Sequence, residues 1–198
     1  MHGPFRLINF ALTLPSLARW TRKGSCEFLS ELRDQHFIRG NALNTDKPSY
    51  YAASVVRGTE VQLLQVVNGQ TTVLGTVKSS EYLSNAWVTV KIRAEGNALK
   101  VFLYRGDTNQ YLGSNGKWTS SPSAAIEKTS SAIMNGGYVG FARPAGVAGD
   151  VPIDSLRIGG AGSGIYTPIR EERFDGGSLN RVPDGWSQWI DGSSVVIT

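Results

Sequence analysis

The sequence predicts an all-β protein built as a sandwich of two antiparallel sheets, and three observations carry that prediction. Gly and Asn recur in pairs at short intervals, and both residue types tolerate the positive φ angles that tight hairpins require. Between these pairs apolar and polar residues alternate, which is the pattern of a half-buried strand. Few segments of the 198-residue chain have the apolar period of a helix. Many short strands joined by turns favour a sandwich.

The N-terminal segment is the least regular part of the sequence. Residues 27–34, "EFLSELRD", combine good helix propensity with an ambiguous apolar pattern, so a helix competes with a strand there. Residues 1–25 contain a short apolar stretch, but the cationic residues Arg19 and Arg22 follow it. A secretory signal places its cationic residues first, so we expect no signal peptide in this segment.

The stretch "YYAASVVRGTEVQLLQVVNGQTTVLG", residues 50–75, reads as three strands joined by two turns. Arg57-Gly58 and Asn68-Gly69 mark the turns, and Asn-Gly is the strongest short-range signal of a hairpin. We therefore expect a three-stranded meander here.

The clearest hairpin follows in "AWVTVKIRA" and "LKVFLYR", which the turn Gly96-Asn97 separates. Val88, Val90 and Ile92 share one face of the first strand, and the second strand alternates in the same way. One face of this hairpin should therefore be buried and the other exposed.

Three later segments complete the expected strands. Residues 138–143, "YVGFAR", and 153–159, "IDSLRIG", have strand patterns. In "SAAIEKTSSAIMN" Ser and Thr occupy four of thirteen positions, which weakens a helix and favours strand and turn.

The formal net charge of the chain is +4, but its distribution argues against nucleic-acid binding. Residues 1–40 hold six basic and three acidic side chains, so the other 158 residues carry a net charge of only +1. A nearly neutral body lacks the basic stripe that phosphate binding needs. No run of about 18 apolar residues occurs, so we expect no membrane span.

Taken in order, four segments resemble the laminin-G-like, concanavalin A-like jelly-roll modules of large bacterial surface and secreted proteins. The segments are "QHFIRGNALNTDKPSYYAASVVRGTEVQLLQVVNGQTTVLG", "SNAWVTVKIRAEGNALKVFLYR", "NQYLGSNGKWTSSP" and "NGGYVGFARPAGVAGDVPIDSLRIGG". The resemblance covers about residues 35–160. It implies a concanavalin A-like jelly-roll sandwich and an extracellular or cell-surface location.

The tail "EERFDGGSLNRVPDGWSQWIDGSSVVIT" resembles the opening of a second copy of the same module. Phe174, Asp175, Val182, Pro183, Gly185, Trp186 and Trp189 stand at the places of its motif. The resemblance divides the chain into a poorly matched segment 1–34, a sandwich 35–160, a Gly-rich linker 161–171 and the opening strands 172–198. It also implies neighbouring copies. A unit without its own opening strands exposes a sheet edge, so we expect the tail to complete the first sandwich.

Catalytic motifs are not apparent. Retaining glucanases of this fold carry carboxylates at alternate positions of a strand, whereas here Glu171 and Glu172 are adjacent and Asp150 and Asp154 stand four apart. The lone Cys26 forms no internal disulfide, and the sequence has no Gly-x-Ser-x-Gly elbow for a hydrolytic triad. We therefore expect no enzyme, with a glycoside hydrolase of the glucanase class as the alternative.

Binding is the favoured activity, because sugars dock on aromatic faces with polar groups beside them. The loop-rich region 104–118 offers both kinds of side chain, and its candidate ligand-binding residues are Tyr104, Asp107, Asn109, Tyr111, Asn115 and Trp118. Asp and Asn are also common turn formers, and Tyr104 or Trp118 can belong to the core instead.

The same Asp and Asn oxygens are suitable calcium ligands, and laminin-G-like relatives often hold calcium, but no repeated Asp spacing occurs. We therefore expect no obligatory cofactor, with calcium as an open alternative. The sequence predicts a non-catalytic module of a larger extracellular protein that binds a glycan or another cell-surface ligand, or that acts as a spacer.

Overall fold

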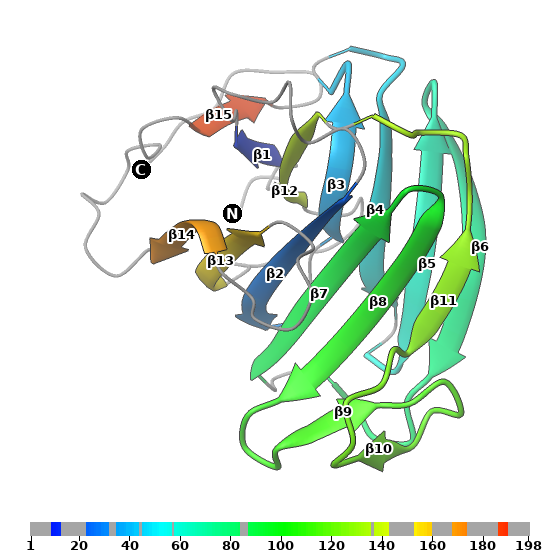
Figure 1. Ribbon diagram of the computed structural model, residues 1–198, viewed down its shortest axis with the longest axis vertical. Coiled ribbons are helices and arrows are strands. Elements are labelled where there is room, and N and C mark those ends of the chain that lie inside the picture. The colour runs from blue at the N-terminus through cyan, green and yellow to red at the C-terminus, as the bar shows by residue number, and fades with distance from the viewer. Residues whose placement is uncertain are drawn as a thin grey trace, which may run out of the picture.

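The computed structural model describes backbone for ten stretches of the chain, and Figure 1 shows how they are arranged. They are residues 9–12, 23–31, 35–43, 45–56, 58–83, 87–135, 137–142, 153–159, 168–173 and 186–189. Side chains are described within 35–142 and at 156–159. Strands, turns and bends make up these stretches, and no helix long and apolar enough to cross a membrane occurs among them.

In the described part of the chain, sheet A has seven strands. In spatial order they are β15 (Trp186–Trp189), β1 (Asn9–Leu12), β12 (Tyr138–Ala142), β3 (Gln35–Asn41), β4 (Ser49–Val56), β5 (Glu60–Val67) and β6 (Gln70–Lys78).

The described residues give sheet B eight strands. Its main path is β10 (Trp118–Thr119), β9 (Gln110–Leu112), β8 (Ala98–Arg105), β7 (Trp87–Glu95), β2 (Lys23–Glu31), β13 (Ile153–Gly159) and β14 (Pro168–Arg173). The eighth strand, β11 (Ile126–Thr129), pairs with β8 beside β9.

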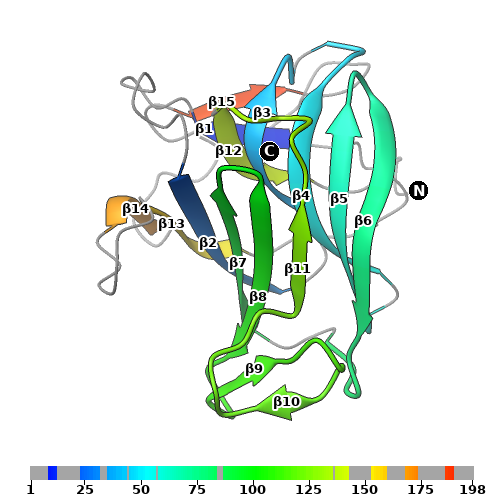
Figure 2. The ribbon, with the colours of Figure 1, turned by 45° about the vertical axis from the view of Figure 1, so that its right-hand side comes forward.

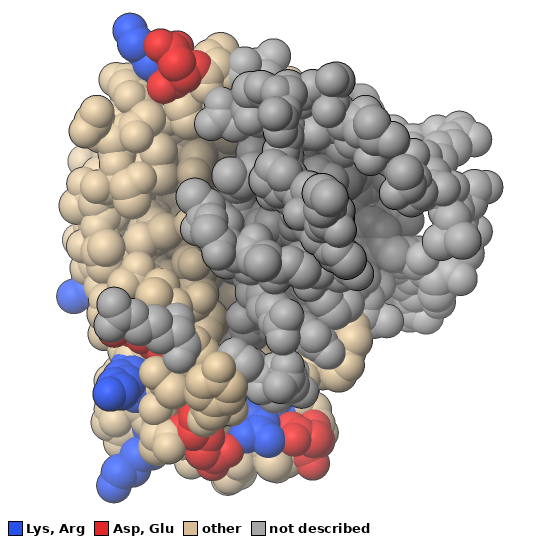
Figure 3. Space-filling view, turned by 180° about the vertical axis from the view of Figure 1, so that it is seen from behind, with Lys and Arg blue, Asp and Glu red and all other residues tan. Residues whose placement is uncertain are grey.

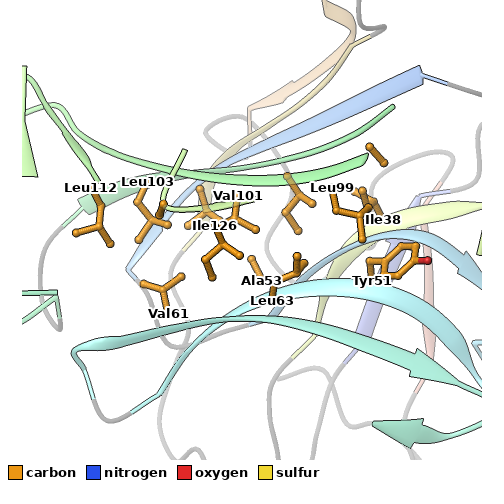
Figure 4. Packing of buried hydrophobic residues seen from close by; sticks show 14 of the residues in the cluster. Ile38, Tyr51, Ala53, Val61, Leu63, Leu99, Val101, Leu103, Leu112 and Ile126 are labelled. Atoms are coloured by element: carbon orange, nitrogen blue, oxygen red, sulfur yellow. The ribbon is translucent and has the colours of Figure 1, made fainter. Parts of the chain in front are cut away.

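The fold class predicted from the sequence, an all-β jelly-roll sandwich of two antiparallel sheets, is confirmed. Every strand pair among the described residues is antiparallel, and the chain crosses between the sheets several times. The sheets bury their facing surfaces against each other, as Figure 4 shows for the contact between β7 and β8 on one side and β4 and β5 on the other. Leu63, Ile92 and Leu103 lie in this core and have no exposed surface.

The meander of residues 50–75 is confirmed as β4, β5 and β6, and the hairpin that follows is confirmed as β7 and β8. Asn68 and Gly69 have φ angles of 49° and 80°, which fits the primed turn that joins two strands by two residues. Along β7 the buried and half-buried residues alternate as the sequence predicts. The expected strands near 138–143 and 153–159 are β12 and β13, and β11 occupies the Ser- and Thr-rich segment.

The helix considered for residues 27–34 is wrong for residues 27–31. These residues belong to β2, which pairs with β7 on one side and with β13 on the other. Both neighbouring strands form backbone hydrogen bonds with this segment. This tertiary pairing overrides helix propensities, which differ by at most about 0.7 kcal/mol per ordinary residue.

Both ends of the chain contribute strands to the sandwich. The segment before residue 35 supplies β1 and β2. After residue 160, β14 lies beside β13 and includes residues 168–171 of the predicted linker, and β15 of the tail lies beside β1. Phe174, Asp175, Val182, Pro183 and Gly185 lie outside the described residues. The assignment of the tail to a second copy stays a prediction.

A buried polar network ties the β11–β12 connection to sheet A. The Tyr51 hydroxyl, on a residue with no exposed surface, accepts the Ile133 N–H at 3.0 Å and donates to Ser130 Oγ at 2.9 Å. Ser130 Oγ in turn donates to Gln65 Oε1 at 2.6 Å.

Arg39 holds the same connection from β3. Its Nη1 donates to the Ile133 carbonyl at 2.8 Å, and burial lowers its pKa from the ordinary arginine value. Arg39 lies where the register between β3 and β4 is irregular, and its φ angle is 55°. The residue is only 3% exposed. The connection therefore depends on Tyr51 and Arg39 together.

We predict that Tyr51→Phe destabilises the fold by about 1–3 kcal/mol, because the buried Ile133 N–H loses its acceptor. Urea unfolding followed by tryptophan fluorescence measures the change. The matched control is Tyr50→Phe on the same strand, whose hydroxyl forms no hydrogen bond among the described residues. That variant should stay within about 0.5 kcal/mol of the parent. Equal effects of the two substitutions would contradict the network.

Candidate functional site

Two candidate residues meet on the outer face of sheet B. Tyr104 of β8 lies directly opposite Tyr111 of β9, with ring centroids 4.9 Å apart and ring planes at 43°. Their neighbours Leu103 and Leu112 are fully buried in the core. Because successive side chains of a strand point to opposite faces, the two rings lie on the solvent side, where both are half-buried. We call Tyr104 and Tyr111 the tyrosine pair.

Asn109 fixes one member of the tyrosine pair. It ends the turn between β8 and β9 with a φ angle of 53°, a conformation that Asn tolerates better than most residues. This turn brings Asn109 Oδ1 to 2.9 Å from the Tyr104 hydroxyl, which donates to it. The Tyr104 ring therefore loses rotational freedom before any ligand arrives.

Trp118 belongs to the opposite face of the sheet. It pairs with Leu112 in the register between β10 and β9, and it packs against the hydrophobic core. Its Nε1 donates to Ser79 Oγ at 3.1 Å, and the Arg105 guanidinium lies 5.5 Å from its ring centroid. Trp118 thus anchors the end of the sandwich and does not join the tyrosine pair.

Arg105 organises the charged groups at this end. Its Nε and Nη2 donate to the two carboxylate oxygens of Asp107 at 3.1 and 2.7 Å, and its Nη1 donates to Glu81 at 2.5 Å. The hydrogen bond from Arg105 lowers the pKa of Asp107, and the same bond raises the pKa of Arg105. Asp107 therefore serves as the partner of Arg105.

Asn115 shapes the turn between β9 and β10. Its Oδ1 accepts the Lys117 N–H at 3.0 Å, and the next residue, Gly116, has a φ angle of 79°. A Cβ at Gly116 would lie 2.0 Å from the Lys78 carbonyl oxygen, so only glycine lets this turn approach the end of β6 so closely. Asn115 is thus a turn residue in this structure.

The structure therefore divides the six candidates. Tyr104, Asn109 and Tyr111 come together on the outer face of sheet B. Asp107, Asn115 and Trp118 instead hold the loops and the end of the sandwich through the contacts above. The sequence could not separate the two sets, because β9 and β10 are too short for their alternation to be read.

Trp87 is a residue that the site prediction left out. It begins β7, is 45% exposed, and has the same parity as Thr89, which lies opposite Tyr104. Trp87 and the tyrosine pair therefore share the outer face of sheet B. Alternation along β7, which was read correctly, places Trp87 outward and is the signal that identifies it.

The arrangement does not fit the calcium alternative. The side-chain oxygens of Asp107, Asn109 and Asn115 each accept a hydrogen bond from a different neighbour. Within the described stretches, no three His, Cys, Asp or Glu side chains gather in a way that could hold a metal ion.

We predict that the Asp107 carboxyl titrates below its ordinary value of 3.8 and that Arg105→Met raises its midpoint towards that value. A carboxyl with a lowered folded-state pKa stabilises the fold above its unfolded pKa and loses that contribution as the pH falls through the folded value. The stability difference between the parent and Arg105→Met should therefore shrink below about pH 4. Carboxyl ¹³C NMR gives the midpoints. Lys117→Met, which removes a cation of the β9–β10 turn that is not among the causes of the Asp107 shift, should leave the midpoint in place.

Comparison with known proteins yields matches among solved structures. No protein-family model and no curated protein matches the chain. Sheep galectin-11 in complex with glycerol matches with a TM-score of 0.40 and 10% identity, over 79% of this chain and 99% of that one. The native heptameric SAP-like pentraxin from Limulus polyphemus matches with a TM-score of 0.37 and 12% identity, over 80% of this chain and 71% of that one. Similarities of this size do not bear on what this chain binds.

Proposed function

We propose that this chain is a non-catalytic carbohydrate-binding module and that the tyrosine pair is its binding surface. The observation that carries the proposal is the pair itself: two aromatic rings in contact on the solvent face of a rigid sheet, one of them held by Asn109. Aromatic rings with one apolar face and a polar tip suit ligands that also combine apolar and polar surfaces, and sugars are such ligands.

The surroundings of the pair supply polar groups at its rim. Asn109 accepts from Tyr104 through Oδ1, and its Nδ2 donates to no other described residue, so it is available to a sugar hydroxyl. Thr89 lies opposite Tyr104 on the next strand, and the exposed Trp87 extends the aromatic surface. Such a mixture of rings and a few polar groups is typical of ligand sites.

The carboxylates near the pair argue against hydrolysis as its activity. A retaining glycosidase needs one carboxyl with a raised pKa as its acid and a second carboxylate as its nucleophile. Glu81 and Asp107 instead share the Arg105 guanidinium, and the pKa of Asp107 is lowered. These three residues form a structural ion-pair cluster, so the glucanase alternative ranks second. The glucanase alternative predicts that the chain releases reducing sugar.

We further propose that the module works at the cell surface or outside the cell, as part of a larger protein with neighbouring copies. The resemblance of residues 35–160 and of the tail to surface modules supports this location. A module that holds only a spacer role would present the same sandwich without binding any sugar.

We predict that a glycan array probed with the whole chain gives a defined set of hits, and that Tyr111→Ala weakens binding to the best hit at least ~10-fold by titration calorimetry. Loss of the ring removes the contact surface that it shares with Tyr104. Tyr111→Phe keeps the ring and should bind within about threefold of the parent, since about 0.7 kcal/mol separates such affinities.

Both variants must keep the unfolding midpoint of the parent, which is expected because Tyr111 lies outside the core. An array without hits would favour the spacer role. Binding that survives Tyr111→Ala unchanged would place the sugar site elsewhere on the sandwich. Reducing-sugar release by the parent chain would favour the hydrolase.

A further inference from the structure

The first half of the edge strand β6 lacks the charged side chains and proline that usually protect a sheet edge. Among the described residues no strand pairs with its outer side, and Figure 2 shows it as the outermost strand of sheet A. Natural edges are commonly blocked by charged side chains or proline, because their unpaired backbone groups invite another strand. Residues 68–77, "NGQTTVLGTV", contain neither a charged residue nor a proline.

The hairpin geometry determines which backbone groups are open. Val67 and Gln70 flank the two-residue turn Asn68-Gly69, so they form the hydrogen-bonded pair that closes the hairpin. Because antiparallel pairs alternate, the N–H and C=O groups of Thr71 and Val73 point away from β5. The Thr71 side chain is exposed, and that of Val73 is 49% exposed.

The second half of β6 is less open than the first. A Cβ built on Gly75 would lie 2.8 Å from Ile126 Cγ2 and 2.9 Å from Lys128 Cε, so β11 lies against the strand at this point. The register between β5 and β6 also shifts just before Gly75. The open segment is therefore Gln70–Leu74.

We propose that this segment is a dimer interface and that its occupant is the same segment of a second copy of the chain. The two strands run antiparallel about a two-fold axis between the two Thr72 residues. Thr71 of each copy then lies opposite Val73 of the other, and these are the residues whose backbone groups are open. The two sheets A join into one continuous sheet.

The outer face of sheet A favours a second copy as the occupant. One apolar row runs from Phe37 through Ala52 and Leu64 to Val73. The first three are buried within the chain, and only Val73, at the edge, is exposed. In the proposed register the row continues into Thr71, Val66 and Tyr50 of the second copy, which form a row of their own. Figure 3 shows that the described part of this face carries its charged residues at the two ends and few between them.

Charge also selects the direction of pairing. Lys78 is the cation at the end of β6, and in the antiparallel arrangement the two Lys78 side chains lie at opposite ends of the interface. A parallel arrangement would bring them together. An isologous interface of this kind closes on itself and stops at two copies.

Sedimentation velocity of the whole chain tests the proposal over concentrations from on the order of 1 µM to 1 mM, because a single pair of strands forms an interface at the small end of the known range. We expect a shift from monomer to dimer across this range. Amide hydrogen exchange read residue by residue should slow at Thr71 and Val73 as the concentration rises. The Thr72 amide, which faces β5, should be protected throughout.

Val73→Lys places two cations across the axis and should weaken the dimer at least ~10-fold. Ser120→Lys adds the same charge at an exposed position beyond β10 and should leave the dimer intact. Thr71→Pro removes only an N–H that points away from β5, so the monomer should fold and the dimer should be lost.

Three results would overturn the proposal. They are a chain that stays monomeric at the highest concentration, a dimer that Val73→Lys and Thr71→Pro leave unchanged, and a dimer in which the Thr71 and Val73 amides remain unprotected. Pairing of β6 with a foreign peptide in place of a second copy would likewise show up as a monomer in the purified chain.

Discussion

The apolar contact between the two sheets is the constraint from which the rest of the structure follows. Leucine, valine and isoleucine side chains of β7 and β8 fill the space against β4 and β5 with almost no exposed surface. Because a strand alternates its side chains, burial of one face decides what the other face shows to solvent. The burial of Leu103 therefore places Tyr104 outside, and the burial of Leu112 does the same for Tyr111.

At the end of the sandwich formed by β9 and β10, both polar and apolar contacts cover the core. Trp118 covers the core there, and Arg105 lies over its ring while two carboxylates neutralise the guanidinium. Exposed ion pairs of this kind contribute little stability singly, so their value lies in fixing the loop geometry. The same loops position Asn109 beside Tyr104. Trp118 and the tyrosine pair thus share one short stretch of chain but occupy opposite faces of the sheet.

At the β11–β12 connection, side chains satisfy buried backbone groups. There the backbone enters the interior, and Tyr51 and Arg39 supply the hydrogen bonds that buried N–H and C=O groups require. The β6 edge shows the reverse situation, because its backbone groups face outward and no described strand pairs with them. The buried backbone groups of the β11–β12 connection thus have side-chain partners, whereas the outward backbone groups of β6 have no partner strand among the described residues.

The sequence by itself determined the sheets but not the site. Alternation and glycine-containing turns were sufficient to place β4 to β8, since local chemistry sets both the period and the turn. Tertiary structure decided that residues 27–31 form a strand, because pairing with β7 and β13 outweighs helix propensity. It also decided that Trp118 faces the core while Tyr104 and Tyr111 meet outside. The face that a side chain takes in β9 and β10 depends on their register with β8, and two or three residues carry no period from which that register can be read.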